Sequence, residues 1–117
     1  MRLLPLALAS AVAGCAAPRS NATVEDARAA CETYYAAETQ TKPGDVENRA
    51  KPLLHSDYDD LGVELVRFAT HTRRLQGHVA DGNGNAAVKD VQALRKSAER
   101  IDALCAAVGV TPPPENA

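Results

Sequence analysis

Apolar residues recur every three or four positions through most of this chain, and this spacing constrains the fold more than any other feature of the sequence. Such a period places apolar side chains on one face of a helix, whereas a half-buried strand would need strict alternation. The spacing predicts helices over residues 23–40, from about Ser56 to between Gly77 and Gly82, and over 85–108. The sequence therefore predicts an all-α fold.

Residues suited to the start of a helix precede two of these segments. Thr23 with Asp26, and Ser56 with Asp59, have the three-residue spacing of a capping box, in which two side chains bond the free N–H groups of the first turn. The third helix also begins with side chains whose negative charge favours its dipole, namely Asp57, Asp59 and Asp60.

Turn residues mark where the helices end. The Lys-Pro-Gly run at 42–44 breaks the first helix, because proline lacks the N–H and glycine frees the backbone. A shorter second helix is expected over 45–54, where Pro52 leaves open a short helix, a kink or a restart. The run 81–85 has turn chemistry, and Gly109 is suited to end the last helix before three consecutive prolines.

Charge and composition exclude one class of partner. The chain has 13 Lys and Arg against 15 Asp and Glu, a formal net charge of −2, with one Phe, three Tyr and no Trp. A nucleic-acid-binding domain would show a basic stripe interleaved with aromatic residues, so no nucleic-acid partner is expected. Abundant alanine also predicts a thin core, which a domain of this size needs to reinforce.

The first 15 residues carry an export signal. Arg2 precedes an apolar run over 3–13, which is shorter than the roughly 20 residues that a membrane-spanning helix needs. The run ends in Val-Ala-Gly-Cys at 12–15, and this pattern resembles the signal peptide of bacterial lipoproteins. The resemblance implies that Cys15 receives a diacylglycerol thioether and that the preceding peptide is removed. The alternative is an ordinary signal-peptidase site in Ala-Val-Ala at 11–13, which would release an unanchored protein.

The resemblance divides the chain and gives it a location. The expected parts are a signal peptide over 1–14, a lipidated cysteine and tether over 15–22, a helical domain over 23–109 and a tail over 110–117. The mature chain would hold 12 basic and 15 acidic side chains, a formal net charge of −3. Two acyl chains give lasting attachment, so we expect a lipid-anchored protein on the extracytoplasmic face of the cell membrane.

Export also determines the expected state of the other cysteines. Once Cys15 is assigned to lipid, Cys31 and Cys105 remain in an oxidising compartment and should pair. In a three-helix up-down-up arrangement these cysteines would lie near opposite ends, far beyond the roughly 4.4–6.8 Å between the Cα atoms of a disulfide. With four helices the first and last run antiparallel, so the predicted fold is an up-down-up-down four-helix bundle with a short second helix.

Two patterns raise the question of a bound metal or cofactor. Asp81, Asn83 and Asn85 match the first ligands of an EF-hand calcium loop, but the required glycine and bidentate carboxylate are missing further on, which favours a helix–helix turn. Candidate ligands for haem or a metal are His71 and His78 on the third helix, with His55 and Tyr58 before it. Their spacing is not that of a zinc site, so we expect a solvated helix flank and no resident cofactor or metal.

A cationic cluster on the third helix consists of Arg67, His71, Arg73, Arg74 and His78. These side chains are suited to an anion such as a lipid headgroup or an acidic patch on a partner. The five residues do not share one helix face, so a dispersed solvated surface is the preferred interpretation.

No catalytic motif is found in the sequence. A Gly-x-Ser-x-Gly nucleophile motif is absent, the cysteine pair is committed to structure, and a small bundle offers little volume for a pocket. We therefore expect a non-enzymatic interaction protein whose partners are the membrane, through its anchor, and an envelope protein. The alternatives are a phage-encoded superinfection-exclusion lipoprotein and a carrier of a small ligand such as haem.

Overall fold

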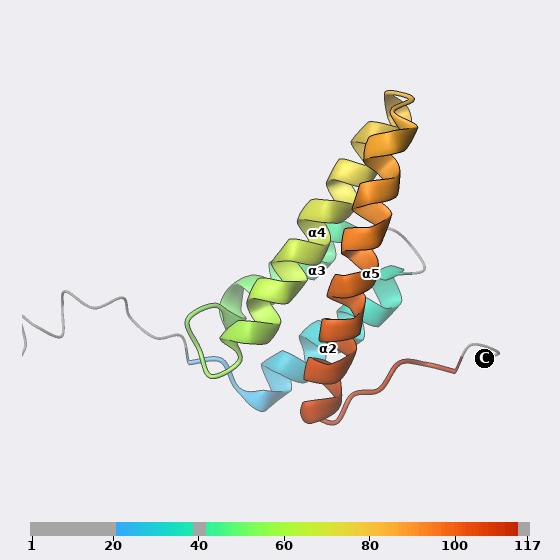
Figure 1. Ribbon diagram of the computed structural model, residues 1–117. Coiled ribbons are helices and arrows are strands. Elements are labelled where there is room, and N and C mark those ends of the chain that lie inside the picture. The colour runs from blue at the N-terminus through green and yellow to red at the C-terminus, as the bar shows by residue number, and fades with distance from the viewer. Residues whose placement is uncertain (1–20, 39–41, 115–117) are drawn as a thin grey trace, which may run out of the picture.

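The computed structural model describes residues 21–38 and 42–114, and within these ranges it contains helices and no strand (Figure 1). The elements are α2 (Val24–Glu38), α3 (Pro43–Ala50), the 3-10 turn η1 (Lys51–Leu53), α4 (Asp59–Ala80) and α5 (Gly84–Ala107). The prediction of an all-α, four-helix fold with a short second helix is confirmed.

The described residues leave some predictions untested. The predicted signal peptide, Cys15 and most of the tether fall in residues 1–20, outside the described ranges, as do residues 115–117 of the predicted tail. Ala22 and Val110, which the sequence assigns to the tether and the tail, pack against the hydrophobic core. The packed domain therefore extends slightly beyond 23–109 at both ends.

The start of α2 is the predicted capping box. The backbone N–H of Thr23 donates to Asp26 Oδ2 at 2.8 Å, and the N–H of Asp26 donates to Thr23 Oγ1 at 3.3 Å. Each side chain thus satisfies a donor that the first turn leaves without a helical partner.

The predicted capping box at the start of α4 is wrong. The helix begins at Asp59. The Asp59 side chain accepts a hydrogen bond from the N–H of His55 at 2.6 Å, because the positive φ of His55, 63°, turns the loop back towards the helix start. The Ser56 hydroxyl instead accepts from the N–H of Tyr58 at 3.0 Å within the loop. The expected acidic first turn is present, with Asp59 and Asp60.

The break after α2 and the position of Pro52 differ from expectation in detail. Pro43 is the first residue of α3 rather than part of the break, because the first turn of a helix needs no N–H at that position. Pro52 lies in η1, so the helix tightens into one 3-10 turn and stops at Leu53. Of the three outcomes left open, the structure has the short helix.

Both long helices end in a Schellman motif, with a glycine of positive φ. Gly82 has φ 71° and Gly109 has φ 87°, a conformation that costs glycine little. At the end of α4, the N–H of Asn83 donates to the His78 carbonyl at 2.8 Å and the N–H of Gly82 to that of Val79 at 3.1 Å. At the end of α5, the N–H of Val110 donates to the Cys105 carbonyl at 2.9 Å and the N–H of Gly109 to that of Ala106 at 3.0 Å. Gly77, expected at the end of α4, lies inside the helix, which continues to Ala80.

The predicted helix–helix turn joins α4 to α5. The Asn83 side chain accepts from the N–H of Ala86 at 3.2 Å and caps α5, which begins at Gly84, one residue before the expected start. In Figure 1 the two helices form a long antiparallel hairpin, and α2 and α3 pack against one side of it, away from the turn. We call the part of the hairpin near the turn the tip (residues 70–96), and the remainder of the packed domain the base.

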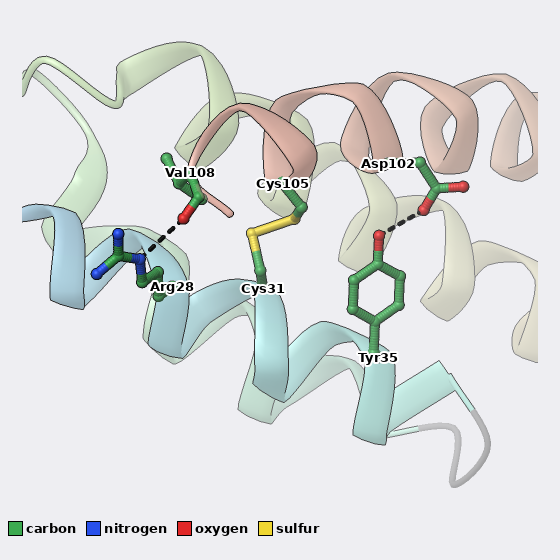
Figure 2. Close-up of a disulfide and its surroundings, with 6 residues drawn as sticks. All are labelled: Arg28, Cys31, Tyr35, Asp102, Cys105 and Val108. Carbon is green, nitrogen blue, oxygen red and sulfur yellow. Dashed lines mark hydrogen bonds between the residues drawn. A yellow bond between two sulfur atoms is a disulfide. The ribbon is translucent and has the colours of Figure 1, made fainter. Parts of the chain in front are cut away.

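The disulfide joins the first and last helices of the base. Cys31 and Cys105 are bonded, with their Cα atoms 5.8 Å apart, so the predicted pairing is confirmed (Figure 2). Cys31 lies midway along α2 and Cys105 in the last turn of α5, since α2 crosses the end of α5 obliquely. Hydrogen bonds flank it on both sides: Arg28 Nε donates to the Val108 carbonyl at 2.8 Å and Tyr35 Oη donates to Asp102 at 2.7 Å.

Candidate binding face on the α4–α5 hairpin

One face of the hairpin is covered by α2 and α3. On α4, Gly62 packs against η1, and Arg73 Nη2 lies 2.6 Å from Glu47 Oε1 of α3. On α5, Asp102 and Cys105 face α2 (Figure 2). The positions on the other side of both helices form a second face, which we call the outer face.

A groove of about 480 Å³ lies on the outer face, where the base half of α4 meets α5. Its lining follows the helical repeat on both sides, with Asp60, Val63, Glu64 and Arg67 from α4 and Arg100, Ala103 and Leu104 from α5. A second hollow of about 230 Å³ adjoins this groove at the start of α4 and the end of α5, and Asp60 and Leu104 line both. The outer face is therefore concave over much of the base, with an apolar floor.

A buried carboxylate organises this groove. Glu64 is only 5% exposed, and its Oε2 accepts from the Ser97 hydroxyl at 2.8 Å. Its Oε1 lies 2.9 Å from Arg67 Nη1 and 3.7 Å from Arg100 Nη1. A buried charge needs such partners, because an unpaired one is strongly destabilising. Glu64 therefore holds two half-exposed guanidinium groups beside the groove.

Cationic side chains continue from the groove towards the tip. On α4, Arg67, His71, Arg74 and His78 are separated by four, three and four residues, which places them on one helix face. On α5, Lys89 and Lys96 share the face of Arg100 by the same rule. Because Arg67 and Arg100 line one groove, both stripes border the outer face.

As expected, the five residues of the cluster do not share one helix face, although the spacing of four of them places those four together. Arg73 alone lies apart, since it contacts Glu47 on the covered side. The pKa of Glu47 is lowered, chiefly by the hydrogen bond from Arg73; desolvation opposes this, and the positive charges of Arg73 and Lys51 lower the pKa further.

The candidate haem or metal ligands do not converge. At about 1.5 Å per residue along a helix, His71 lies about 10 Å from His78 and about 20 Å from Tyr58. His78 Nδ1 lies 2.5 Å from Asp90 Oδ2, while His55 is exposed in the loop before α4. His71 Nδ1 is buried and has no hydrogen-bond partner in the described part of the chain. Among residues 21–38 and 42–114, no group of three His, Cys, Asp or Glu side chains is placed to hold a metal ion.

Sequence reasoning did not single out Glu64, Ser97 or Arg100. The one sequence signal for Glu64 is its spacing with Asp60 and Arg67, which places the three on one side of the helix. The same spacing is equally typical of a solvated surface. Only the antiparallel pairing with α5 brings Ser97 and Arg100 to the same carboxylate.

Comparisons with known proteins identify no relative. No family model matches the chain, and no curated protein or solved structure resembles it at a significant level. Among the described helices, none combines the length and the apolar character needed to cross a membrane.

Proposed function

We propose that this chain is a lipid-anchored, non-enzymatic binding protein on the extracytoplasmic face of a bacterial cell membrane. The observation that carries the proposal is the disulfide between Cys31 and Cys105. Disulfides persist in oxidising compartments outside the cytosol, in agreement with an export signal. Since the chain has three cysteines, the pairing leaves Cys15 without a cysteine partner in the chain and available for lipid.

The shape of the hairpin supports a binding role. The tip extends beyond α2 and α3 (Figure 1) and exposes Val79, Val88 and Val91, which are 64%, 57% and 41% exposed. Val79 lies on the last turn of α4 and the other two on the first turns of α5. Apolar side chains gathered on a projecting element are typical of a surface that meets another protein. We assign the envelope protein partner to this tip.

The anchor is tested by expressing the full chain in a bacterial host and measuring its intact mass and membrane partitioning. We expect a mature chain that begins at Cys15 with added acyl mass and sediments with membranes. Cys15→Ala should abolish both properties, whereas Ser20→Ala, a matched change in the predicted tether, should leave them intact. An unacylated product cut after Ala13, or an uncut chain, would contradict the proposal.

A further inference from the structure

The outer face of the hairpin separates charge in an unusual way. Its cations are Arg67 and Arg74 on α4 and Lys89, Lys96 and Arg100 on α5. The neighbouring carboxylates Glu64 and Asp90 are 5% and 7% exposed, and they are engaged by Arg67 and His78 respectively. From Arg67 towards the turn, this face therefore exposes five basic side chains, against Asp81 at the turn and Glu99 at its edge, which are the exposed acidic ones.

The covering layer carries the opposite charge. Residues 21–38 and 42–53, which include α2, α3 and η1, hold six acidic and four basic side chains. This layer lies on the other side of the hairpin from the outer face (Figure 1). The molecule therefore has a basic side and an acidic side, and an anionic plane would orient it with the outer face inward.

The arrangement of the cations favours a surface over a single ligand. They are spread along both helices, and from Arg67 to His78 the stripe on α4 covers about 16 Å at 1.5 Å per residue. A single small anion would reach only neighbouring members of this stripe, whereas an anionic plane contacts all of them.

We propose that the outer face docks on the anionic lipid surface of the membrane that holds the anchor, with headgroup phosphates bound by Arg67, Arg74, Lys89, Lys96 and Arg100. The inference rests on the proposed function for the presence of that membrane. One lipid anchor combined with a basic patch is a recognised way to hold a protein flat on a bilayer. In this orientation the acidic layer faces away from the bilayer.

The test uses the full chain carrying Cys15→Ala, so that no acyl group contributes to binding. Its sedimentation is measured with vesicles of phosphatidylcholine alone and of equal parts phosphatidylcholine and phosphatidylglycerol. We expect binding to the anionic vesicles only, weakened by added salt. Because each cation near an anionic surface contributes about five-fold in partitioning, Arg74→Gln/Lys89→Gln/Lys96→Gln should lower binding about a hundred-fold.

A matched variant, Lys42→Gln/Arg49→Gln/Arg95→Gln, removes the same charge from the other side, since Arg95 shares the face of Asp102. All six side chains are exposed, so both variants should keep the parent's melting temperature. The control should bind within a few-fold of the parent.

Equal losses in both variants, equal binding to neutral vesicles, or no binding by the parent would overturn the proposal. Retention on immobilised polyglutamate without vesicle binding would assign the face to an acidic protein instead. Because the anchor is absent here, failure of this test leaves the acylation of Cys15 to be judged separately.

Discussion

The base and the tip are built from the same two long helices but are held together by different means. Every buried apolar side chain that the structure describes lies in the base, in residues 27–69 or at Ile101 and Cys105. The buried side chains of the tip within the described residues are Thr72 and Asp90, both polar, while three of its valines are exposed. Stability is therefore concentrated in the base, and the tip is left with its surface available for binding.

The difference shows how a small alanine-rich domain can support a projecting element. The base combines four helices with a disulfide, whereas the tip relies on helix caps and on contacts such as the pair between His78 and Asp90. Regions with few buried apolar contacts open with less free energy than the core. The side chains of the tip that we propose for binding therefore lie where the fold depends on them least.

The largest effect should follow loss of the disulfide. Cys31→Ala/Cys105→Ala removes a link across 74 residues, which should lower the free energy of unfolding by about 4 kcal/mol. For a domain of this size that corresponds to a melting temperature lower by roughly 15–30 °C. Thermal unfolding followed by circular dichroism measures the change. A shift of a few degrees would mean that the base is stable without the link.

A pair of truncations compares the core of the base with the valines of the tip. Leu65 is fully buried, so Leu65→Ala should cost about 2–5 kcal/mol through lost contacts and a cavity. Val91 is 41% exposed, so Val91→Ala should change the free energy of unfolding by about 0.5 kcal/mol or less. Urea denaturation of the two variants gives both values. Similar costs would contradict the division into base and tip.

Two glycines of α4 give the same comparison with one chemical change. A Cβ at Gly62 would lie 3.0 Å from Leu53 Cβ and 3.1 Å from the Ala50 carbonyl oxygen, so Gly62→Ala should destabilise by about 1–3 kcal/mol. A Cβ at Gly77 meets nothing within 4 Å, and Gly77→Ala should stabilise by about 0.5–1 kcal/mol because alanine favours the helix. The expected result is a pair of melting shifts of opposite sign. Shifts of the same sign would show that close packing does not distinguish the two sites.

The smallest effect concerns the boundary between base and tip, where Glu47 of α3 contacts Arg73 of α4. The pKa of Glu47 is lower in the folded protein than in the unfolded chain, where it is near 4.5. The Glu47 charge therefore stabilises the fold above the unfolded pKa, and this stabilisation is lost as the pH falls through the folded pKa. Glu47→Gln should therefore lower the melting temperature slightly at neutral pH and have no effect in acid. Melting curves across pH measure this, and a difference that persists at the lowest pH would point to lost packing instead.

Local patterns predicted the helices well, and the disulfide followed from the cysteine count and the export signal. The three- and four-residue spacing placed α2 and α5 within a few residues, and Thr23 with Asp26 formed the expected cap because both partners lie in one turn. The start of α4 was missed because the positive φ of His55 redirects the Asp59 side chain. Such a turn depends on how the loop packs, which local spacing does not record.

The candidate binding face was harder to predict. The spacing of Arg67, His71, Arg74 and His78 was sufficient to place them together, but Arg73 obscured the pattern. The burial of Glu64 could not be read from sequence, since it depends on Ser97 from a second helix. The position of an open face between two helices can be predicted only when it is known how the helices pair and which side of the pair other helices cover.

Amide hydrogen exchange of the full chain carrying Cys15→Ala, with and without anionic vesicles, tests the separation of stability from binding most directly. Without vesicles, the slowest amides should lie at 27–35, 61–69 and 98–105, and those at 74–92 should exchange orders of magnitude faster. Vesicles should then slow exchange in the tip and leave α2 and α3 unchanged. Uniform protection along α4 and α5, or vesicle protection centred on α2, would contradict a stable base that carries a separate binding hairpin.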